Sequence, residues 1–289
     1  MSSSKAKGPQ KKRAGSGKAR RPAKKAVRST KKAAVRKAKP AAGTARPAAK
    51  AAPPKRATPK KMTPTAKATS ETREEAAARA LEISEILSRT YPDARCLLDY
   101  QSPFQLLIST ILAAQCTDER VNMVAPALYQ RFPDPLSMGA ADILELEELI
   151  RSTGFFHSKA KSIKGAASEL AGRFPGGFPR TMEELVSLPG VGRKTANVVL
   201  GNCFNVPAII VDTHVSRVAA DRLALAEPGP PERIEADLQA LLPPEKWTRF
   251  SHTVGFHGRK CCTARGPACP WCPIRELCPW PLKTTQIKG

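Results

Sequence analysis

Acidic and large apolar residues are missing from the first 70 positions of this 289-residue chain. Residues 1–70 contain 23 Lys and Arg but no Asp, Glu, Trp, Tyr, Phe, Leu or Ile. A segment with so little apolar surface cannot offset the entropy it would lose on ordering, so we expect residues 1–70 to be disordered. Because no acidic residue neutralises it, the segment is expected to attract a polyanion in a salt-dependent way.

The charge of this tail does not extend into the rest of the chain, which carries 25 basic and 25 acidic residues. The one-sided charge favours nucleic acid as the polyanion. A solubilising or targeting extension is the alternative. A transit peptide ranks second, because such peptides are also basic, although a segment this rich in Lys and Pro would form a poor amphipathic helix.

Long hydrophobic runs are also missing. The most apolar stretch, FQLLISTILAA at residues 104–114, is too short to span a bilayer, and no secretory signal precedes it. Runs of strand-like alternation are absent as well, whereas apolar residues recur at helical spacing almost everywhere after the tail. We therefore expect an all-α fold of one large or two small domains, and no membrane partner.

Three stretches show how the expected helices begin. Ser102 and Gln105, with Pro103 between them, predict a capping box at the start of a helix that is apolar almost all round, so this helix is expected to be central and buried. Thr181 and Glu184 predict a second capping box, before a helix that must stop at Pro189 and Gly190.

The third stretch, VDTHVSRVAADRL at residues 211–223, places Asp212 at a natural helix N-cap position. The spacing predicts that one face of this helix carries apolar side chains: Val211, Val215, Val218 and Ala219.

Two glycines and a lysine lie close together in LPGVGRKTANVV, residues 188–199. Gly190 and Gly192 allow a tight turn between two helices, the second beginning near Arg193. Without side chains in the way, the N–H groups of the turn can bind an anion, and beside a polycationic tail a nucleic-acid phosphate is the natural one. An ordinary turn between two helices is the alternative for a lone GxG.

The stretch LPGVGRKTA, with the aspartate of VDTH 18 positions after Lys194, resembles the helix-hairpin-helix and Gly/Pro-Asp signature of the DNA glycosylase superfamily that includes endonuclease III. The resemblance continues through SPFQLLISTILAAQCTDERVN, GFFHSKA and HGRKCC, and covers about residues 75 to 280. It implies a protein that grips damaged double-stranded DNA with the hairpin and flips one base out of the duplex.

The resemblance also implies that Lys194 and Asp212 are the catalytic residues. Lys194 can act as a nucleophile only if a fraction of it is neutral near pH 7, which desolvation or a neighbouring cation such as Arg193 would favour. Its attack on C1′ of the sugar displaces the base and leaves a Schiff base that permits β-elimination. Asp212 would help to activate the amine and stabilise positive charge on the sugar. Outside this family, Lys194 would more often be a solvated lysine and Asp212 a helix cap.

An enzyme that flips a base needs a polar side chain for the orphaned partner and an apolar wedge for the gap. The resemblance places Gln115 in the first role and Phe155 in the second, with Gly190, Gly192 and Arg193 at the DNA backbone. Otherwise Gln115 would be a solvated residue at a helix end, and Phe155 or its neighbour would be ordinary core. His157 occupies a position where relatives have Asn, so its contact with DNA stays open.

Five of the eight cysteines lie within residues 261–278, which in a cytosolic protein indicates metal ligation rather than disulfides. Zinc prefers two separate C-x2-C pairs, and only one is present, so a [4Fe-4S] cluster is favoured. The ligands expected from the C-x6-C-x2-C-x5-C spacing, which also matches endonuclease III, are Cys262, Cys269, Cys272 and Cys278.

The remaining cysteines are given other roles. We interpret Cys261 as a spare thiol, and we expect Cys96, Cys116 and Cys203 to pack in apolar surroundings. The cluster would order a loop whose basic side chains Arg259, Lys260 and Arg265 contact phosphate, or it would carry electrons.

The sequence therefore predicts a monomeric bifunctional glycosylase and lyase of base excision repair in the bacterial cytoplasm or nucleoid, acting on oxidised pyrimidines and cleaving the strand 3′ to the abasic site. The family layout implies a discontinuous iron–sulfur domain of residues 71–95 and 207–283 around a six-helix barrel of residues 96–206. A mismatch glycosylase on the same scaffold is one alternative. A non-catalytic, histone-like DNA-binding protein is another, although mere binding needs neither Lys194 nor Asp212.

Overall fold

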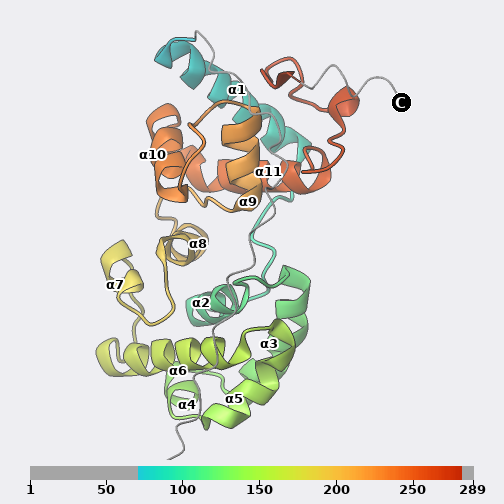
Figure 1. Ribbon diagram of the computed structural model, residues 1–289. Coiled ribbons are helices and arrows are strands. Elements are labelled where there is room, and N and C mark those ends of the chain that lie inside the picture. Colours follow the sequence, from blue (N-terminus) through green and yellow to red (C-terminus); the bar gives the residue numbers. More distant parts are fainter. Residues whose placement is uncertain (1–70, 282–289) are drawn as a thin grey trace, which may run out of the picture. The chain divides into compact units, whose positions relative to one another are not determined.

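Helices make up the regular structure in residues 71–281, the part of the chain that the computed structural model describes (Figure 1). Residues 282–289 and the basic tail of residues 1–70, with the disorder expected for it, lie outside the described residues. The described residues contain no strand, which confirms the all-α prediction. None of their helices is both long and apolar enough to cross a bilayer.

The α-helices are α1 (Arg73–Thr90), α2 (Pro103–Leu112), α3 (Asp118–Arg131), α4 (Pro135–Gly139), α5 (Ile143–Ile150), α6 (Phe156–Arg173), α7 (Met182–Val186), α8 (Arg193–Cys203), α9 (Thr213–Ser216), α10 (Pro231–Leu241) and α11 (Trp247–Lys260). Shorter turns are the 3-10 turns η1 (Arg151–Thr153), η3 (Pro244–Lys246) and η4 (Cys269–Trp271) and the π-helical turn η2 (Arg217–Arg222).

Side chains cap the start of both helices for which a capping box was predicted, α2 and α7, but the box is complete only at α7. Thr181 and Glu184 form the full capping box of α7. At α2, the Ser102 hydroxyl accepts from the Gln105 N–H (3.2 Å), but the Gln105 side chain accepts from the Gln101 N–H instead of that of Ser102. The capping box predicted there is therefore only half formed, because the extended backbone before the helix presents the neighbouring N–H to the amide.

One hydrophobic core is built by α2 to α8. As predicted, α2 is its buried centre, since all residues from Leu106 to Leu112 are buried, and α2 packs on α3, α6 and α8. Helices α4 and α5 pack on α6, which carries Ile163, Ala166 and Leu170 into the core. The long helix α6 thus links the short helices to the centre.

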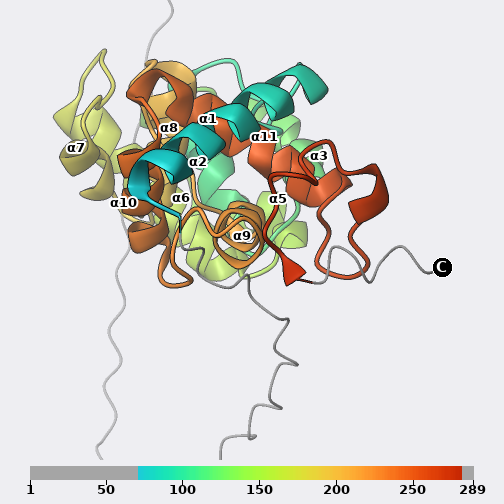
Figure 2. The same ribbon diagram turned by 90° about the horizontal axis from the view of Figure 1, so that it is seen from above.

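A second core is built by α1, α9, η2, α10 and α11. Thr72 and Glu75 form a capping box for α1, and Ile83 and Leu87 are completely buried one turn apart. Helix α1 packs alongside α11 and α10, as Figures 1 and 2 both show. The division into two domains, residues 71–95 with 207–283 and residues 96–206, stays a prediction beside these two cores.

The segment of residues 208–212, which has no regular secondary structure, leads into α9. Ile209 and Val211 pack in the second core, whereas Ile210 packs in the first. Consecutive side chains of this segment therefore connect the two cores just before Asp212.

The stretch predicted as one helix after Asp212 is α-helical only over α9, and it continues as the π turn η2. The apolar face was predicted correctly, since Val211, Val215, Val218 and Ala219 are all buried. The predicted continuous α-helix is wrong from Arg217 onward. A π turn has more residues per turn than an α-helix, so it changes which of the following side chains point inward. Arg222, the last residue of this turn, is buried inside the protein.

Candidate active site

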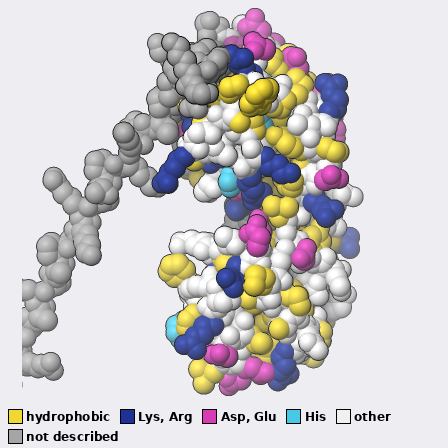
Figure 3. Space-filling view, turned by 90° about the vertical axis from the view of Figure 1, so that its right-hand side faces the viewer, with side chains coloured by type: hydrophobic (Ala, Val, Ile, Leu, Met, Phe, Trp, Pro, Cys, Tyr) yellow, Lys and Arg dark blue, Asp and Glu magenta, His cyan; other side chains and the backbone are white. Residues whose placement is uncertain are grey.

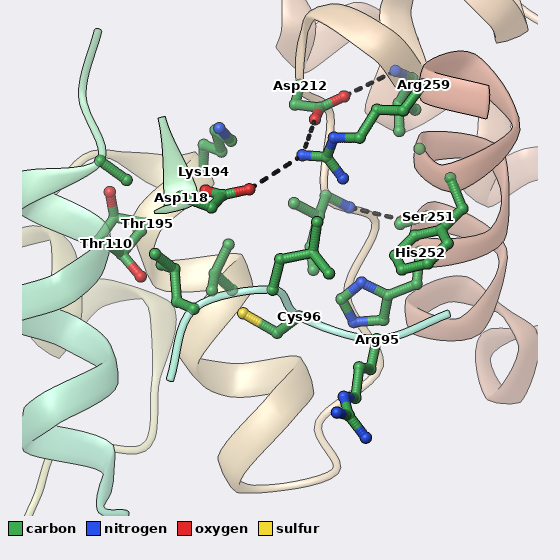
Figure 4. A pocket seen from close by; sticks show the side chains of 18 of the residues that line it. Arg95, Cys96, Thr110, Asp118, Lys194, Thr195, Asp212, Ser251, His252 and Arg259 are labelled. Carbon is green, nitrogen blue, oxygen red and sulfur yellow. Dashed lines mark hydrogen bonds and ion pairs between the residues drawn. The ribbon is translucent and has the colours of Figure 1, made fainter. Parts of the chain in front are cut away.

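A cavity of about 250 Å³ lies where the two cores meet, and both Lys194 and Asp212 line it. Its walls come from the C-terminal end of α2, the first turn of α8, the segment before α9 and one face of α11 (Figure 4). Residues that are far apart in the sequence, from Arg95 to Arg259, are thereby brought together around one space.

Lys194 belongs to the first turn of α8, after Gly192, which is the N-cap residue. Its side chain is exposed at the cavity, and among the described residues it has no ion-pair partner. Helix α8 begins here because the glycine turn ends and the apolar run of Ala196 to Leu200 is buried in the first core. The amine is thus held on a rigid element while remaining accessible.

Asp212 caps α9, as predicted. Its Oδ1 accepts from the backbone N–H groups of His214 (2.8 Å) and Val215 (2.7 Å). These two bonds fix the carboxylate at the cavity wall and leave Oδ2 to face Arg259 of α11, with Oδ2 and Nη2 3.8 Å apart.

Arg259 joins two carboxylates across the cavity. Its Nη2 lies 3.3 Å from Oδ2 of Asp118, which begins α3, as well as 3.8 Å from Oδ2 of Asp212. In Figure 4 the guanidinium lies between the two acidic side chains, with Lys194 beside Asp118. The sequence interpretation of Arg259 as a phosphate contact on the cysteine loop missed this bridging position.

Two buried side chains hold the backbone that carries Asp212. The Asn197 amide on α8 donates to the Ile209 carbonyl (2.9 Å), and the Ser251 hydroxyl on α11 accepts from the Ile210 N–H (2.8 Å). Asn197 follows Lys194 by about one turn of α8. These hydrogen bonds to the backbone of residues 209 and 210 help to fix the position of Asp212 relative to Lys194.

Sequence reasoning missed His252 and placed Cys96 only in general apolar packing, yet both line this cavity. Burial, with Arg249 and Arg259 nearby, lowers the pKa of His252 to about 4, so its imidazole is neutral at pH 7. Its Nε2 donates to Oδ1 of Asn202 (2.9 Å). Burial raises the pKa of the Cys96 thiol, although Arg259 and Lys194 oppose the rise. No motif in the sequence marks either residue as a neighbour of Lys194.

A second recess gathers three of the residues predicted to bind DNA: Gln115, Phe155 and Gly190 all line it. Gln115 (φ 53°) and Phe155 (φ 50°) adopt left-handed backbone conformations, which are strained for residues with side chains. Phe155 is 67% exposed, so it is not core, whereas the next residue, Phe156, packs against the first core. An exposed aromatic ring held by a strained backbone is typical of a functional position.

The buried ammonium of Lys159 ties the elements around this recess together. Its Nζ donates to the Leu112 carbonyl at the end of α2 and to the Thr153 carbonyl in η1, both at 2.8 Å. The loop with Gln115 follows the first carbonyl, and Phe155 follows the second. Lys159 therefore links the backbone segments that lead to Gln115 and Phe155.

The hairpin turn depends on Gly190 more than on Gly192. Gly190 has φ 76°, and a Cβ there would lie 2.5 Å from Cβ of Ser162 on α6. Gly192 has an ordinary φ of −98°, and a Cβ on it would meet no atom within 4 Å. Gly190 is thus required by the turn itself, whereas Gly192 leaves open space in front of the N-terminus of α8.

Two other candidates have protein partners. Arg193 forms a two-pronged ion pair with Glu235 of α10, with distances of 2.8 and 2.9 Å. His157 is exposed and its Nδ1 lies 2.8 Å from Glu147. Glu235 offsets part of the positive charge of Arg193. The proposed effect of Arg193 on the Lys194 amine and the contact of Arg193 with DNA therefore stay predictions.

A separate cavity at the end of α11 brings the C-terminal cysteines together. Cys262, Cys269, Cys272 and Cys278 all line it, and all four are thiols rather than halves of disulfides. Cys261 also lines this cavity, and its sulfur lies within 4.8 Å of the ligand atoms of Cys272 and His257.

The residues of this cavity fit an anionic metal–sulfur group. The walls are apolar apart from thiols and basic side chains, and the buried Nε and Nη1 of Arg222 find no hydrogen-bond acceptor among the described residues. Unpaired cationic donors facing four thiols match the chemistry of a thiolate-ligated cluster with negative charge.

Figure 3 shows one face of the described part hollowed, with Lys and Arg side chains gathered on one side of the hollow and Asp and Glu side chains on the other. The basic side attracts the phosphates of a nucleic acid.

Comparison with known proteins agrees with this geometry. Residues 108–244 match the family described as HhH-GPD superfamily base excision DNA repair protein. Endonuclease III of Synechocystis sp. is 54% identical over 202 residues, which cover 70% of this chain and 92% of that protein.

Two solved structures are similar to about three quarters of the chain. A non-covalent endonuclease III–DNA complex is 38% identical with a TM-score of 0.69, covering 74% of this chain and 99% of the other. A trapped endonuclease III–DNA covalent intermediate has the same identity and TM-score and covers 73% and 99%. The chain therefore belongs to the endonuclease III family of DNA glycosylases, within the HhH-GPD superfamily of base excision DNA repair proteins.

Proposed function

We propose that this protein removes oxidised pyrimidines from double-stranded DNA and then cleaves the strand at the abasic site, with Lys194 as the nucleophile for both steps. The observation that carries the proposal is that Lys194 and Asp212 line the same cavity, with the Lys194 side chain exposed. The trapped covalent complex of a related endonuclease III supports a covalent path.

In the first step, the neutral amine of Lys194 attacks C1′ as the C1′–N bond breaks, and the departing base takes up a proton. The amine, now bonded to C1′, gives up the proton that the base takes; the C1′–O4′ bond then breaks as O4′ takes up a proton, and the nitrogen lone pair forms the C1′=N bond of a protonated Schiff base. Asp212 stabilises the positive charge that develops on the sugar, because Oδ2 is not used in capping α9.

In the second step, the Schiff base makes the C2′ hydrogen acidic. Its removal forms the C1′ to C3′ conjugated system while the C3′–O bond breaks and the 3′ phosphate leaves. Water then hydrolyses the imine and returns Lys194. One lysine thus provides both glycosylase and lyase activity.

For the flipped base, we propose the inner wall of the same cavity as the binding site. Its volume of about 250 Å³ has room for a single base, and neutral His252 provides a polar contact in its mixed polar and apolar lining. Gln115 and Phe155 would fill the space left in the duplex. Gly190 and Gly192 would let a phosphate approach the start of α8, with Arg193 nearby.

A [4Fe-4S] cluster is proposed for the cysteine cavity, with Cys262, Cys269, Cys272 and Cys278 as ligands. When bound, such a cluster supplies a rigid cross-link and a one-electron couple. The chain's own residues do the rest: Arg217 donates to the Cys262 carbonyl (3.1 Å) and the Gly258 carbonyl (2.7 Å), which holds the loop against α11.

The test is a panel of duplexes that carry thymine glycol, an abasic site or a G·T mismatch, with base release and strand cleavage measured separately. We expect base release from the thymine glycol duplex and cleavage of both the first and second duplexes. Base release only from the mismatch would favour the mismatch glycosylase, and tight binding without either product would favour the histone-like protein. We also expect the enzyme to act as a monomer.

A further inference from the structure

Arg222 is a completely buried arginine that forms no ion pair with the described residues. Only 2% of its surface is exposed, and its Nε and Nη1 have no hydrogen-bond acceptor among the described residues. No ion pair found within residues 71–281 includes it, and the neighbouring Asp221 attracts it only through its charge. A buried charge without partners is strongly unfavourable, so a group that pairs with it is expected.

The guanidinium faces the cysteine cavity. Arg222 lines that cavity with Cys262, Cys269, Cys272 and Cys278, and its Cζ lies 3.7 Å from the centre of the Trp280 ring. The ring covers one face of the guanidinium plane, so the N–H groups at its edge are the ones left to donate. No carboxylate is among the described residues that line this cavity.

The π turn puts Arg222 in this position. Arg222 is the last residue of η2, and its carbonyl accepts from the Cys278 thiol (3.6 Å). At the other end of the turn, Arg217 donates to the Cys262 carbonyl. One turn therefore contacts both the first and the last of the four cysteines, and Arg222 lines the cavity that these cysteines share.

We propose that Arg222 donates hydrogen bonds from Nε and Nη1 to the sulfur atoms of the cluster, and that its positive charge stabilises the more reduced state of the cluster. This inference rests on the proposed [4Fe-4S] cluster. Four thiolates give such a cluster a net negative charge, and its potential depends on net charge and on hydrogen bonds to sulfur. A fixed cation favours the state with one more electron, whichever one-electron couple is accessible.

The experiment uses the full chain purified without oxygen, and its first measurement is the iron and sulfide content of the wild-type protein. Equal amounts of iron and sulfide, about four of each per chain, are expected. A protein without iron, or with zinc instead, would contradict the proposed cluster, and the role of Arg222 would fall with it.

The second measurement compares the midpoint potential and the rate of cluster loss to a chelator in wild type, Arg222→Lys and Arg222→Met. Arg222→Met is expected to shift the potential to a more negative value and to lose the cluster severalfold faster. Arg222→Lys keeps the charge but not the fork of donors, so its potential should lie between the other two. Arg233→Met, which removes an exposed arginine on α10 paired with Glu227, is the control and should match wild type.

A cluster with unchanged potential in Arg222→Met would overturn the inference, as would a shift of the same size in the control. If Arg222→Met does not fold, Arg222→Lys decides: a potential equal to wild type and an unchanged rate of loss would contradict donation by the guanidinium. Trp280→Leu separates packing from charge, because it removes the ring and leaves the cation, so its potential should stay closer to wild type than that of Arg222→Met.

Discussion

At the scale of single residues, the two oxygens of Asp212 have different partners. Oδ1 accepts two backbone N–H groups of α9, and Oδ2 faces Arg259 and the cavity. The interpretation of Asp212 as a helix cap and its proposed role in chemistry are therefore compatible, because each uses a different atom. Arg259 also pairs with Asp118, so it limits how far either carboxylate can turn.

The neighbouring cysteines Cys261 and Cys262 should differ in their effect on iron binding. If Cys262 is a ligand and Cys261 a spare thiol, Cys261→Ser keeps the iron content of wild type, whereas Cys262→Ser loses most of it. Iron analysis and the visible absorption of the purified variants check this. The reverse result would assign the ligand to Cys261, whose sulfur lies in the same cavity near Cys272.

The half-buried His252 should make the protein less stable in acid. Its pKa is about 4 in the folded protein and near 6.5 in the unfolded chain, so between these values the unfolded chain binds a proton that the folded protein does not. The free energy of unfolding should therefore fall as pH drops from about 6.5 to 4, by up to about 3 kcal/mol from this group. Urea titrations of wild type and His252→Gln at several pH values measure it. Equal pH dependence in the two proteins would contradict this assignment.

At the scale of secondary-structure elements, the hairpin before α8 gives a matched pair of glycine variants. Gly190→Ala forces a Cβ against Ser162 at positive φ and should lower the free energy of unfolding by about 1–3 kcal/mol. Gly192→Ala has room and an ordinary φ, so its stability should stay within about 1 kcal/mol of wild type.

The same pair separates folding from DNA contact. Since Gly192 leaves open space at the start of α8, a methyl group there would obstruct a phosphate, and Gly192→Ala should bind a lesion duplex more weakly despite normal stability. Denaturant titration and binding by fluorescence anisotropy are the two measurements. Unchanged affinity in Gly192→Ala would place the phosphate elsewhere.

Local patterns predicted the elements well where the signal lies within a few residues. The Thr181–Glu184 capping box, the Asp212 cap and the start of α8 are all found where the sequence places them. The π turn η2 was missed, because the inward turn of Arg222 is stabilised by contacts with distant cysteines and Trp280 rather than by local propensity. For the same reason, His252 and Arg259 could not be placed beside Asp212 without the packing of α11 against α9.

At the scale of the whole molecule, the basic charge resides in the tail, whereas residues 71–289 have balanced charge. We propose that the tail prolongs residence on DNA or directs the protein to the nucleoid. Removing residues 1–70 should make the salt dependence of DNA binding shallower, by about 0.9 in the log–log slope for each phosphate that the tail neutralises. Binding isotherms of both proteins from low to high salt test this. Equal slopes would contradict a tail that binds phosphate.

The central claim is that Lys194 forms a covalent bond to the sugar, and borohydride trapping tests it most directly. The full-length protein is incubated with a duplex that carries one thymine glycol, or an abasic site, and the imine is reduced. Lys194→Ala is the test variant, and Lys246→Ala, which removes a lysine of η3 that does not line the cavity, is the control. We predict a protein–DNA adduct with wild type and Lys246→Ala but none with Lys194→Ala. The absence of an adduct on both duplexes, or an adduct that persists in Lys194→Ala, would contradict the account.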